Sequence, residues 1–443
     1  MSSRFKTRRL PIQPGPAAWN RLLPEPAPAV RLSAPRSADI AIIGGGIAGL
    51  SAARRLIQID PSAKVVVLEA GRIAEGPAGR NSGFMIDLPH DLSSDSYSGA
   101  AEADRAETAL NRSAIAFAAD AAQQYGLSKD VFNPCGKINA AATPSGDRHN
   151  REYGEHLARL NESHRLLDAE EMAQITGTPF YSSGLFTPGT AILQPAAYVR
   201  GLAAGIGHQV SIYEQSPVLE IVEQSGGWQL TTPQAKISTD RVILATNGHA
   251  ESFGLFKHRL MHVFTYASMT SPFGEGVLDG EPQWGVTPAD PMGTTVRRIR
   301  SGNQFRILIR SRFTYNPKMT VSDGALTRAG KLHDKKFAQR FPMLKETEME
   351  YRWSGHLCLS LNGVQAHGEV AKGVFSAVCQ NGLGLAKGTL SGISAAELAM
   401  GRESEITRAL CAMEPPRRLP PEPFTWLGAN ARMKWSEWRA GRE

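Results

Sequence analysis

The sequence predicts an α/β protein in which a Rossmann-like domain with a parallel sheet is accompanied by an interleaved α+β domain built on an antiparallel sheet. Residues 39–70 read as a buried strand, a glycine-rich turn, a helix and a second buried strand, which is the order of a parallel βαβ unit. Residues 258–320 alternate apolar residues with polar or basic ones, a pattern typical of an antiparallel sheet with one face on a core. Near the end of the chain, a strand at 373–379 and an alanine-rich helix that ends at Gly401 predict a further strand–helix unit.

Length and composition indicate a folded protein of two to three domains. The chain has 443 residues, of which 42% are apolar and 21% are charged. No run reaches the ~20 uncharged apolar residues of a membrane helix, and prolines follow Arg8 and Arg9 where the apolar part of a secretory signal would stand. The 4 cysteines show no CxxC pairing and no metal-ligand spacing. We therefore expect the protein to reside in the reducing cytoplasm, with no disulfide framework and no metal site.

The positive net charge does not by itself indicate nucleic acid. The chain has 49 basic and 42 acidic residues, which gives a formal net charge of +7. These charges are spread along the sequence, and no nucleic-acid recognition motif accompanies them. We expect a general attraction for anionic ligands, with neither nucleic acid nor a membrane as a partner.

The segment 39–70 carries the strongest functional signal. Gly44 allows a tight turn after the first strand, Gly46 lets the backbone approach a pyrophosphate, and Gly49 lets the helix pack closely on the strand. The N-terminus of that helix offers free N–H groups and the positive end of its dipole to phosphates. Glu69, at the end of the second strand, is placed to accept hydrogen bonds from both hydroxyls of an adenosine ribose. A dinucleotide is therefore expected to bind here.

The residues after Glu69 favour FAD over the nicotinamide dinucleotides. The carboxylate would clash with the 2′-phosphate of NADP, but an acid at this position does not separate NAD from FAD. Where an NAD domain normally continues with another helix and strand, this chain has the Gly/Arg/Asn-rich segment 76–84. Its backbone amides and small side chains suit the ribityl chain and ring of a flavin. A flexible surface loop is the alternative for this segment.

Two further segments have backbones suited to a cofactor. The buried strand 241–244 ends in the small residues of 245–248 (Ala-Thr-Asn-Gly), past which a cofactor can approach closely. The alanine-rich helix opens at 380–385 (QNGLGL), a second glycine-rich helix start whose N–H groups can stabilise negative charge. Residues 411–423 are proline-rich and are expected to be extended.

Taken together, these features resemble the D-amino-acid-oxidase-like FAD-dependent oxidoreductases and, within that superfamily, the bacterial gamma-glutamylputrescine oxidases. The similar pieces run in order from residue 38 to residue 402. The glycine fingerprint at 39–53 and RVILATNGH at 241–249 occur in many flavoproteins, whereas RNSG at 80–83 and YRWSG at 351–355 are more specific to this subgroup. The N-terminal extension with Trp19 is also similar.

The resemblance implies a discontinuous FAD-binding domain beside a substrate domain whose sheet covers the flavin ring. We expect an N-terminal extension at 1–36, the FAD-binding domain at 37–130, 190–257 and 350–412, the substrate domain at 131–189 and 258–349, and a C-terminal tail at 413–443. The residues expected to hold FAD are Gly44, Gly46, Gly49, Glu69, Ala70, Arg72, Arg80, Asn81, Ser82, Val218, Ala245, Thr246, Gly382, Leu383 and Gly384.

The chain departs from the pattern of this family in two places. Gly382-Leu383-Gly384 stands where relatives often have Gly-His-Gly, and Ser82 stands where they tend to have glycine. Both places lie near the expected active site, so the resemblance does not fix gamma-glutamylputrescine as the substrate. Cys358 lies near the strand position at which some relatives attach flavin covalently, offset by one residue.

The reaction that the resemblance implies removes a hydride from the carbon next to an amine nitrogen and gives an imine, which water hydrolyses to an aldehyde. A small-molecule amine is the expected substrate, with oxygen or an electron carrier as the acceptor. The amine must be neutral to donate hydride, so we expect an apolar pocket and no obligatory side-chain base. An arginine in the pocket wall can hold a substrate carboxylate through two hydrogen bonds. The candidate catalytic residues are Tyr266, Arg310, Arg312, Trp353 and His356.

Two other functions stay open at this point. One is a flavin dehydrogenase that acts on an amino acid or hydroxy acid and passes electrons to an acceptor other than oxygen. The other is a flavin-binding subunit without turnover. The sequence does not predict the oligomeric state.

Overall fold

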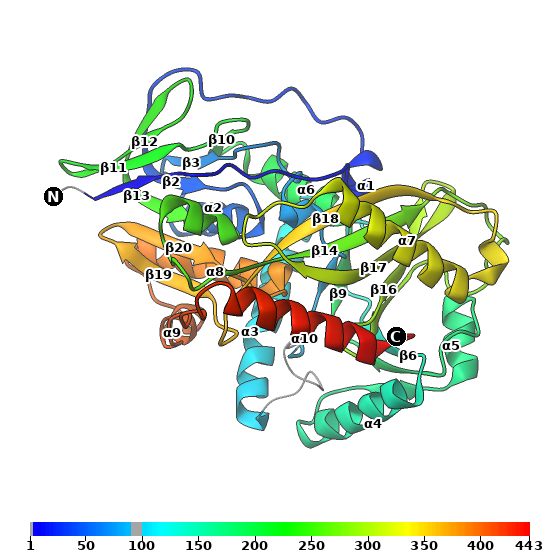
Figure 1. Cartoon of the computed structure of the whole chain (residues 1–443). Helices are drawn as coiled ribbons and strands as arrows, with labels where there is room; N and C mark the ends of the chain where they lie inside the picture. The colour runs from blue at the N-terminus through cyan, green and yellow to red at the C-terminus, as the bar shows by residue number, and fades with distance from the viewer. Residues whose placement is uncertain (1–2, 90–99) are drawn as a thin grey trace.

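Two large β-sheets dominate residues 3–89 and 100–443, which are the residues that the computed structural model describes (Figure 1). One sheet has a parallel centre covered by helices, and the other is almost entirely antiparallel. This arrangement confirms the predicted fold class, an α/β protein with a Rossmann-like sheet and an interleaved antiparallel sheet.

The first sheet contains the predicted βαβ unit. Its described strands are β1 (Arg4–Lys6), β2 (Arg36–Ile43), β3 (Val65–Leu68), β10 (Val210–Tyr213), β11 (Glu220–Gln224), β12 (Gly227–Thr231), β13 (Lys236–Leu244), β19 (Ala366–Ala371) and β20 (Val374–Val378). The parallel part runs in the order β10-β3-β2-β13-β20. The strands β11 and β12 form an antiparallel ribbon that joins β13, and β1 adds to the outer edge of that ribbon. Residues 40–43 of β2 are buried, as a central strand covered on both faces requires.

Four helices form the main core next to the parallel strands. They are α2 (Ile47–Ile59), α3 (Ala101–Gln124), α6 (Pro195–Ile206) and α8 (Gly384–Ala399). α8 packs along α2 and α3, and small residues line the contact. A Cβ on Gly392 of α8 would lie 2.2 Å from the carbonyl oxygen of Ala48 in α2, so these two helix backbones are in direct contact. The helix that follows the glycine-rich turn and the alanine-rich helix, far apart in sequence, thus build one layer.

The second sheet has eight described strands in the order β18-β14-β17-β16-β15-β6-β8-β7. They are β6 (Lys137–Ala141), β7 (Arg165–Leu167), β8 (Ser183–Thr187), β14 (Met261–Thr270), β15 (Trp284–Pro288), β16 (Thr295–Ser301), β17 (Gln304–Tyr315) and β18 (Met349–Leu359). Its helices are α4 (Pro144–Arg159), α5 (Ala169–Thr176) and α7 (Asp323–Arg340). The predicted boundary at residue 350 assigned β18 to the FAD-binding domain, but β18 pairs with β14 along almost its whole length. The other domain boundaries remain predictions.

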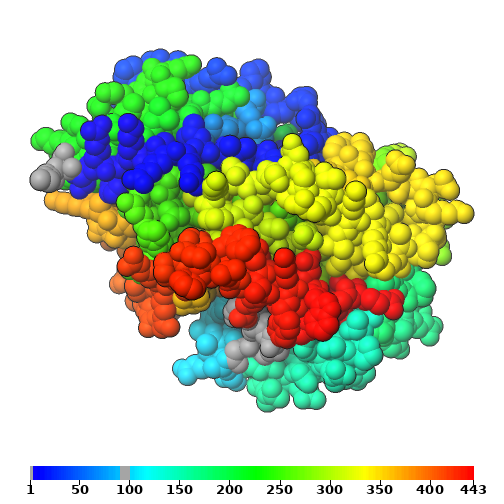
Figure 2. Space-filling view, in the orientation of Figure 1, coloured from blue at the N-terminus to red at the C-terminus, as the bar shows by residue number. Residues whose placement is uncertain are grey.

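Short elements connect the two sheets. A small sheet contains β4 (Phe84–Met85), β5 (Phe132–Asn133) and β9 (Ala191–Leu193), and three 3-10 turns stand at Pro77–Gly79, Asn247–Phe253 and Pro342–Leu344. The remaining helices are α1 (Ala18–Arg21), α9 (Glu405–Cys411) and α10 (Phe424–Ala440). α10 lies across the front of the molecule, red in Figures 1 and 2, where the sequence predicted only a tail. The chain end is anchored, since the carboxylate of Glu443 accepts hydrogen bonds from Ala142 N at 2.9 Å and Thr143 Oγ1 at 2.7 Å.

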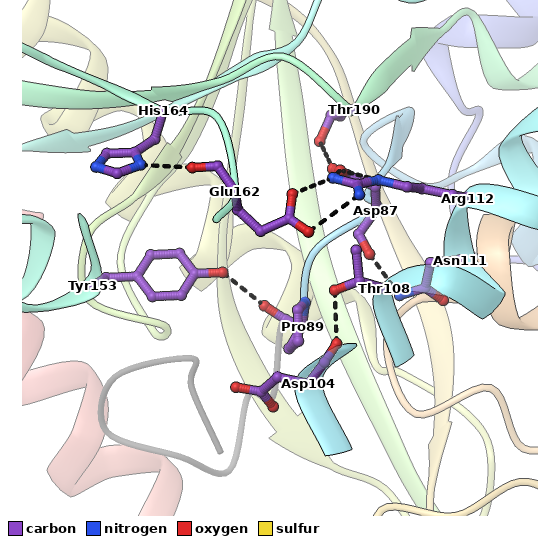
Figure 3. A network of polar contacts seen from close by, with 10 residues as sticks. All are labelled: Asp87, Pro89, Asp104, Thr108, Asn111, Arg112, Tyr153, Glu162, His164 and Thr190. Atoms are coloured by element: carbon purple, nitrogen blue, oxygen red, sulfur yellow. Dashed lines mark hydrogen bonds and ion pairs between the residues drawn. The ribbon is translucent and has the colours of Figure 1, made fainter. Parts of the chain in front are cut away.

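A polar network joins α3 to the second-sheet side of the molecule (Figure 3). The buried carboxylate of Asp87 accepts from Arg112 Nη2 at 3.1 Å and from Thr190 Oγ1 at 3.4 Å. Arg112 also pairs with Glu162, and Asn111 Nδ2 donates to the Asp87 carbonyl at 3.1 Å. Because Asn111 and Arg112 belong to α3 while Glu162 follows α4, the network fixes the two sides relative to each other.

The close contact of α2 and α8 makes Gly392 a sensitive position for stability. In Gly392→Ala the added methyl group would meet the Ala48 carbonyl oxygen at 2.2 Å, so the two helices must move apart. Overpacking of this kind costs about 1–3 kcal/mol in the free energy of unfolding. Urea unfolding followed by circular dichroism measures the difference.

Gly428→Ala provides the matched control for this substitution. Gly428 also lies in a helix, α10, but a Cβ there meets no described atom within 4 Å. Alanine is a better helix former than glycine by up to about 1 kcal/mol, so this variant is expected to be as stable as the native chain or slightly more stable. Equal destabilisation of both variants would contradict the tight α2–α8 contact.

Candidate functional site

The glycine-rich turn after β2 brings three backbone segments together. Gly44 has φ +109°, and a Cβ there would lie 2.6 Å from the Ala245 carbonyl oxygen at the end of β13. A Cβ on Gly49, in the first turns of α2, would lie 1.9 Å from the Gly44 carbonyl oxygen. The turn therefore needs glycine at both positions, as the sequence predicted for a tight turn and a close helix–strand contact.

The N-terminus of α2 is open to a ligand. Its N-cap residue is Gly46, no side chain caps the first turn, and no acidic residue stands in that turn. The first N–H groups of a helix have no partner within the helix, and the helix dipole adds positive potential there. Such a terminus binds phosphate groups.

Glu69 lies beside this turn at the end of β3. Its carboxylate accepts hydrogen bonds from Gly45 N and Gly71 N, both at 2.8 Å. Burial raises the pKa of Glu69, and the two N–H groups oppose that shift without cancelling it. The neighbouring Arg72 donates to Glu214 at 3.2 Å and to the Ala27 carbonyl. These contacts fix the orientation of the carboxylate that the sequence assigned to an adenosine ribose.

The segment 76–84 is a fixed part of the wall. Asn81 Nδ2 donates to the Ala78 carbonyl at 2.7 Å, and Asn81 Oδ1 accepts from Gly83 N at 2.8 Å. The Ser82 carbonyl accepts from the buried Arg297 Nη1 at 2.7 Å. These hydrogen bonds contradict the alternative of a flexible surface loop, because side chains from distant strands hold the backbone.

Arg80 joins this segment to its surroundings. Its guanidinium is buried and donates to the carbonyls of Pro14, Gly15 and Ser354. Burial lowers the pKa of Arg80 to about 10. In the opposite direction, Trp353 Nε1 donates to the Arg80 carbonyl at 2.9 Å. The segment therefore contacts both the N-terminal extension and β18.

A second helix N-terminus stands across the same space. Gly382 has φ +87°, the first residue of α8 is Gly384, and no side chain caps this helix. Its first turn contains no acidic residue. Leu383 packs instead in a small apolar cluster with Phe84, Ile86 and Ile192. The two open helix N-termini, of α2 and α8, give the site two places that stabilise negative charge.

These parts line one continuous cavity, which reaches from the turn after β2 and Glu69 to the start of α8. Of the residues predicted to hold FAD, those in the described lining are Gly44, Gly46, Glu69, Ala70, Arg72, Asn81, Val218, Ala245, Thr246, Gly382 and Gly384. Gly49, Arg80, Ser82 and Leu383 lie directly behind or beside that lining.

The N-terminal extension forms a wall of the cavity, which the sequence did not predict. After β1 the chain crosses the opening, where Thr7 and residues 9–13 line the cavity. Hydrogen bonds from Thr7 N to the Leu219 carbonyl and from Arg8 N to the Ser252 carbonyl, both 2.9 Å, hold this stretch. Figure 2 shows the extension, dark blue, on the surface of the molecule. This proline-rich stretch has no periodic pattern from which such a role could be predicted.

The five candidate catalytic residues lie on β14, β17 and β18, and among them only His356 belongs to the described cavity lining. Trp353 is fully buried, and Tyr266 donates to or accepts from Thr314 Oγ1 at 2.8 Å. Arg312 has φ +63° at a β-bulge opposite Thr265 and Tyr266, and the guanidinium of Arg310 lies 5.3 Å from the ring centre of Phe313. Both arginines are half-buried. Their catalytic roles remain proposals.

A group of histidines surrounds His356. Its ring stacks on Phe264 with centres 5.0 Å apart, and its Nε2 lies 3.2 Å from His262 Nδ1. His249 meets it edge-on with ring centres 5.8 Å apart. Burial, followed by the proximity of His262, lowers the pKa of both His356 and His249, that of His249 to about 4. The imidazoles of His356 and His249 are therefore neutral at pH 7. His262 was not among the site residues predicted from the sequence.

The described residues fit FAD. An open helix N-terminus, a glycine turn and an oriented carboxylate suit the ADP half, and the fixed segment 76–84 with the α8 N-terminus suits the flavin half. Within residues 3–89 and 100–443, no three His, Cys, Asp or Glu side chains are arranged to hold a metal ion. In the same ranges, no helix has the length and apolar character to cross a membrane.

The oriented carboxylate makes Glu69 a test of this binding mode. In Glu69→Ala the dissociation constant for FAD is expected to rise about 10- to 100-fold, because hydrogen bonds to a charged group contribute about 1.5–3 kcal/mol. Titration of the apoprotein with FAD, followed by flavin fluorescence, measures it. Asp60→Asn is the control. The Asp60 carboxylate stands at the end of α2 that is far from the glycine-rich turn, and its described hydrogen bonds go to the neighbouring Ser62. Unchanged FAD affinity in a folded Glu69→Ala protein would contradict the assignment.

Comparison with known proteins gives consistent relatives. The family model described as FAD dependent oxidoreductase, abbreviated DAO, matches residues 39–398. The chain is 27% identical to a probable oxidoreductase OrdL of Haemophilus influenzae over 379 residues, 84% of each chain. It is 24% identical to the gamma-glutamylputrescine oxidoreductase of Escherichia coli over 418 residues, 91% of this chain and 94% of that one.

Among solved structures, glycine oxidase from Geobacillus kaustophilus has the same fold. The TM-score is 0.68 at 20% sequence identity, with 84% of this chain and 96% of that chain covered. The family match spans both sheets and the whole cavity wall apart from the N-terminal extension, from β2 to the end of α8. The chain therefore belongs to the DAO family and is an FAD-dependent oxidoreductase.

Proposed function

We propose that this enzyme oxidises the C–N bond of a small amine or a gamma-glutamylated amine by transfer of a hydride to FAD. The product is an imine, which water hydrolyses to an aldehyde. The partners are then the amine and an electron acceptor, either oxygen or an electron carrier. We place the reaction in the cytoplasm, in keeping with the four free thiols.

The observation that carries the proposal is the uncharged character of one part of the cavity wall. Phe253, Phe264, Met319 and Leu357 contribute apolar side chains, and the imidazole of His356 beside them is neutral. An amine must be neutral to give up hydride, and an apolar, desolvated wall disfavours its protonated form. The similarity to a gamma-glutamylputrescine oxidoreductase over 91% of this chain supports an amine as the substrate class.

The residues of this chain then divide the work between binding and orientation. FAD, when bound, supplies the two-electron redox chemistry. The helix termini at Gly46 and Gly384 hold negative charge, and Glu69 holds the adenosine end. The fixed segment 76–84 and β18 keep the surroundings of the reacting carbon in place, which is the contribution that orientation makes to a rate.

We assign roles to the candidate catalytic residues by their positions in the fold. His356 faces the cavity and is the candidate for direct contact with the amine. Arg310 and Arg312, half-buried on β17, are the candidates for holding a substrate carboxylate. Tyr266 and Trp353 support the strands that carry these residues, through their hydrogen bonds to Thr314 and to the Arg80 carbonyl.

An amino acid is the second candidate substrate, with an acceptor other than oxygen. The fold that this chain shares with a glycine oxidase, at 20% identity, supports an amino acid as the substrate, because the name of that protein gives glycine as its substrate. The two half-buried arginines on β17 also suit a substrate carboxylate.

The proposal predicts that an amine bleaches the flavin. Under anaerobic conditions the visible absorption of the FAD-loaded protein is expected to fall when gamma-glutamylputrescine or a related amine is added. An amine gives two electrons to the flavin, and reduction removes the absorption of the oxidised ring. Readmission of air then distinguishes the acceptors, since return of the spectrum within seconds indicates oxygen.

The substrate panel also decides between the two candidates. Glycine, proline and a hydroxy acid serve as the comparison set for the amines. Bleaching by an amino acid and by no amine would replace the first candidate with the second. A yellow protein that no member of the panel bleaches would contradict the proposed substrate classes while leaving FAD binding intact.

A further inference from the structure

Three polar side chains form a continuous chain from the cavity wall to the protein surface. His356 lines the cavity and is 6% exposed, and its Nε2 lies 3.2 Å from His262 Nδ1. His262 Nε2 lies 2.6 Å from Glu251 Oε2. The side chain of Glu251 is 24% exposed, whereas that of His262 is 2% exposed. The chain therefore starts at the cavity, passes through the interior and ends at solvent.

The hydrogen bonds of this chain fix where its protons are. Burial acts to raise the pKa of Glu251, but the hydrogen bonds from His262 and His258 N and the proximity of both imidazoles together outweigh it and lower the pKa, so the carboxylate is ionised at pH 7 and can only accept. His262 must then donate from Nε2, and the neutral form of its ring has the lone pair of Nδ1 toward His356. His356 in turn donates from Nε2, which leaves a lone pair on its own Nδ1. Every donor in the chain points from the cavity toward Glu251.

The packing around the two rings holds this arrangement in place. A Cβ on Gly248 would lie 2.7 Å from His356 Cε1 and 2.8 Å from His262 Nδ1, so only glycine lets the backbone pass beside both imidazoles. Phe264 stacks on the other side of His356. Glu251 Oε1 accepts from His258 N at 3.1 Å, which orients the carboxylate. Short loops and strands from three places in the sequence thus align the chain.

Several other titratable groups face this chain. His249 contacts His356 and bonds to Ser252 Oγ at 3.3 Å, and the charge of Arg9 acts on His249. Tyr315 on β17 faces Glu251 but donates to Glu422, and Cys358 on β18 lies near Glu251 with Cys379 beside it. The side chain of His258 is exposed next to Glu251. None of these groups interrupts the two hydrogen bonds.

We propose that His356, His262 and Glu251 form a proton relay that carries a proton between the substrate in the flavin cavity and solvent. This inference rests on the proposed function. An ammonium substrate that becomes an iminium loses one hydrogen with two electrons as hydride, which goes to the flavin, and one proton from nitrogen, which needs a separate acceptor. His356 Nδ1 takes that proton, the Nε2 proton of His356 passes to His262 Nδ1, and the Nε2 proton of His262 passes to Glu251, which releases it to solvent.

The relay returns a proton by the same bonds in the second half of the cycle. If oxygen is the acceptor, its reduction to hydrogen peroxide by the two electrons and one hydrogen of a hydride would need one further proton. That proton enters at Glu251 and reaches the cavity through His262 and His356, which restores the starting tautomers. Because burial keeps the His356 ring neutral between transfers, the cavity end of the chain passes protons on without storing charge.

Glu251→Gln tests the relay with little change in structure. The amide oxygen still accepts from His262 Nε2 but takes up no proton. The rate constant of flavin reduction by gamma-glutamylputrescine, measured by anaerobic stopped flow, is expected to fall about 10- to 100-fold at pH 7. The loss is expected to narrow strongly near pH 10, because a primary amine with a pKa of about 10.4 is then neutral in roughly a third of molecules without help from the protein, against less than ~0.1% at pH 7. His262→Phe, which removes the middle of the chain, is expected to show the same pH dependence.

His367→Gln is the matched control. His367 is half-buried and bonds to Ser394 Oγ at 2.9 Å, but it lies on β19 outside the described cavity lining. Its substitution is expected to leave the pH profile of flavin reduction unchanged. A loss in Glu251→Gln that is equal at pH 7 and pH 10 would show a merely structural role and overturn the relay, as would no loss at either pH.

A second measurement does not depend on turnover. In the FAD-loaded protein with ¹⁵N-labelled histidine, His262 and His356 are expected as Nε2–H tautomers by NMR. Exchange of the His356 ring proton with water is expected to be slower in Glu251→Gln by about tenfold or more, because the buried ring has lost its proton path. Unchanged exchange, or an Nδ1–H tautomer at His262, would overturn the relay. If no amine bleaches the native flavin, the proposed function fails, and this exchange rate still decides the relay.

Discussion

The contact between the turn after β2 and the end of β13 is the constraint on which the rest of the site depends. Gly44, with φ +109°, passes so close to Ala245 and to Gly49 of α2 that no methyl group fits at either glycine. Because these backbones touch, the N-terminus of α2 opens directly into the space beside β13. The same contact places residues 245–253 where their side chains form the opposite wall. One backbone arrangement thus sets both the phosphate-binding end of the cavity and the part of its wall that contains His249 and His356, here called the histidine wall.

A second coupling connects the segment 76–84 to parts of the chain that are distant in sequence. Arg80 donates to the carbonyls of Gly15 and Ser354 at 2.7 and 2.8 Å, and Trp353 donates back to the Arg80 carbonyl. Trp19 Nε1 donates to the Asn81 carbonyl at 2.8 Å. The segment 76–84 is therefore clamped between the N-terminal extension and β18. Its position therefore depends on contacts with residues that are far from it in the sequence.

The parts of the fold that were predictable are those specified by neighbouring residues. The unit at 39–70 has its strands, turn and helix within 32 residues, and each glycine has a local reason. The N-terminal wall and the pair His262–Glu251 were not predictable, because their roles come from contacts between distant segments that leave no periodic pattern. α10 was missed for another reason. Its residues Phe424, Trp435 and Trp438 are exposed, so its apolar pattern does not mark a face on the core.

The charges around the cavity differ along its length, and the difference follows from what each end has to hold. The termini of α2 and α8 present unpaired N–H groups without any acidic residue in their first turns, which suits an anionic cofactor. The histidine wall carries no net charge, because burial lowers the pKa of His249 to about 4 and that of His356 further below its usual value. The nearest carboxylate, Glu251, contacts His262 rather than the cavity.

This neutral wall suits an amine. A positively charged wall would repel a protonated amine beside it, and a bare carboxylate there would keep the amine protonated. The neutral imidazoles of His249 and His356 avoid both effects. The hydrogen bonds between His356 and His262 and between His262 and Glu251 satisfy buried ring nitrogens that would otherwise destabilise the fold.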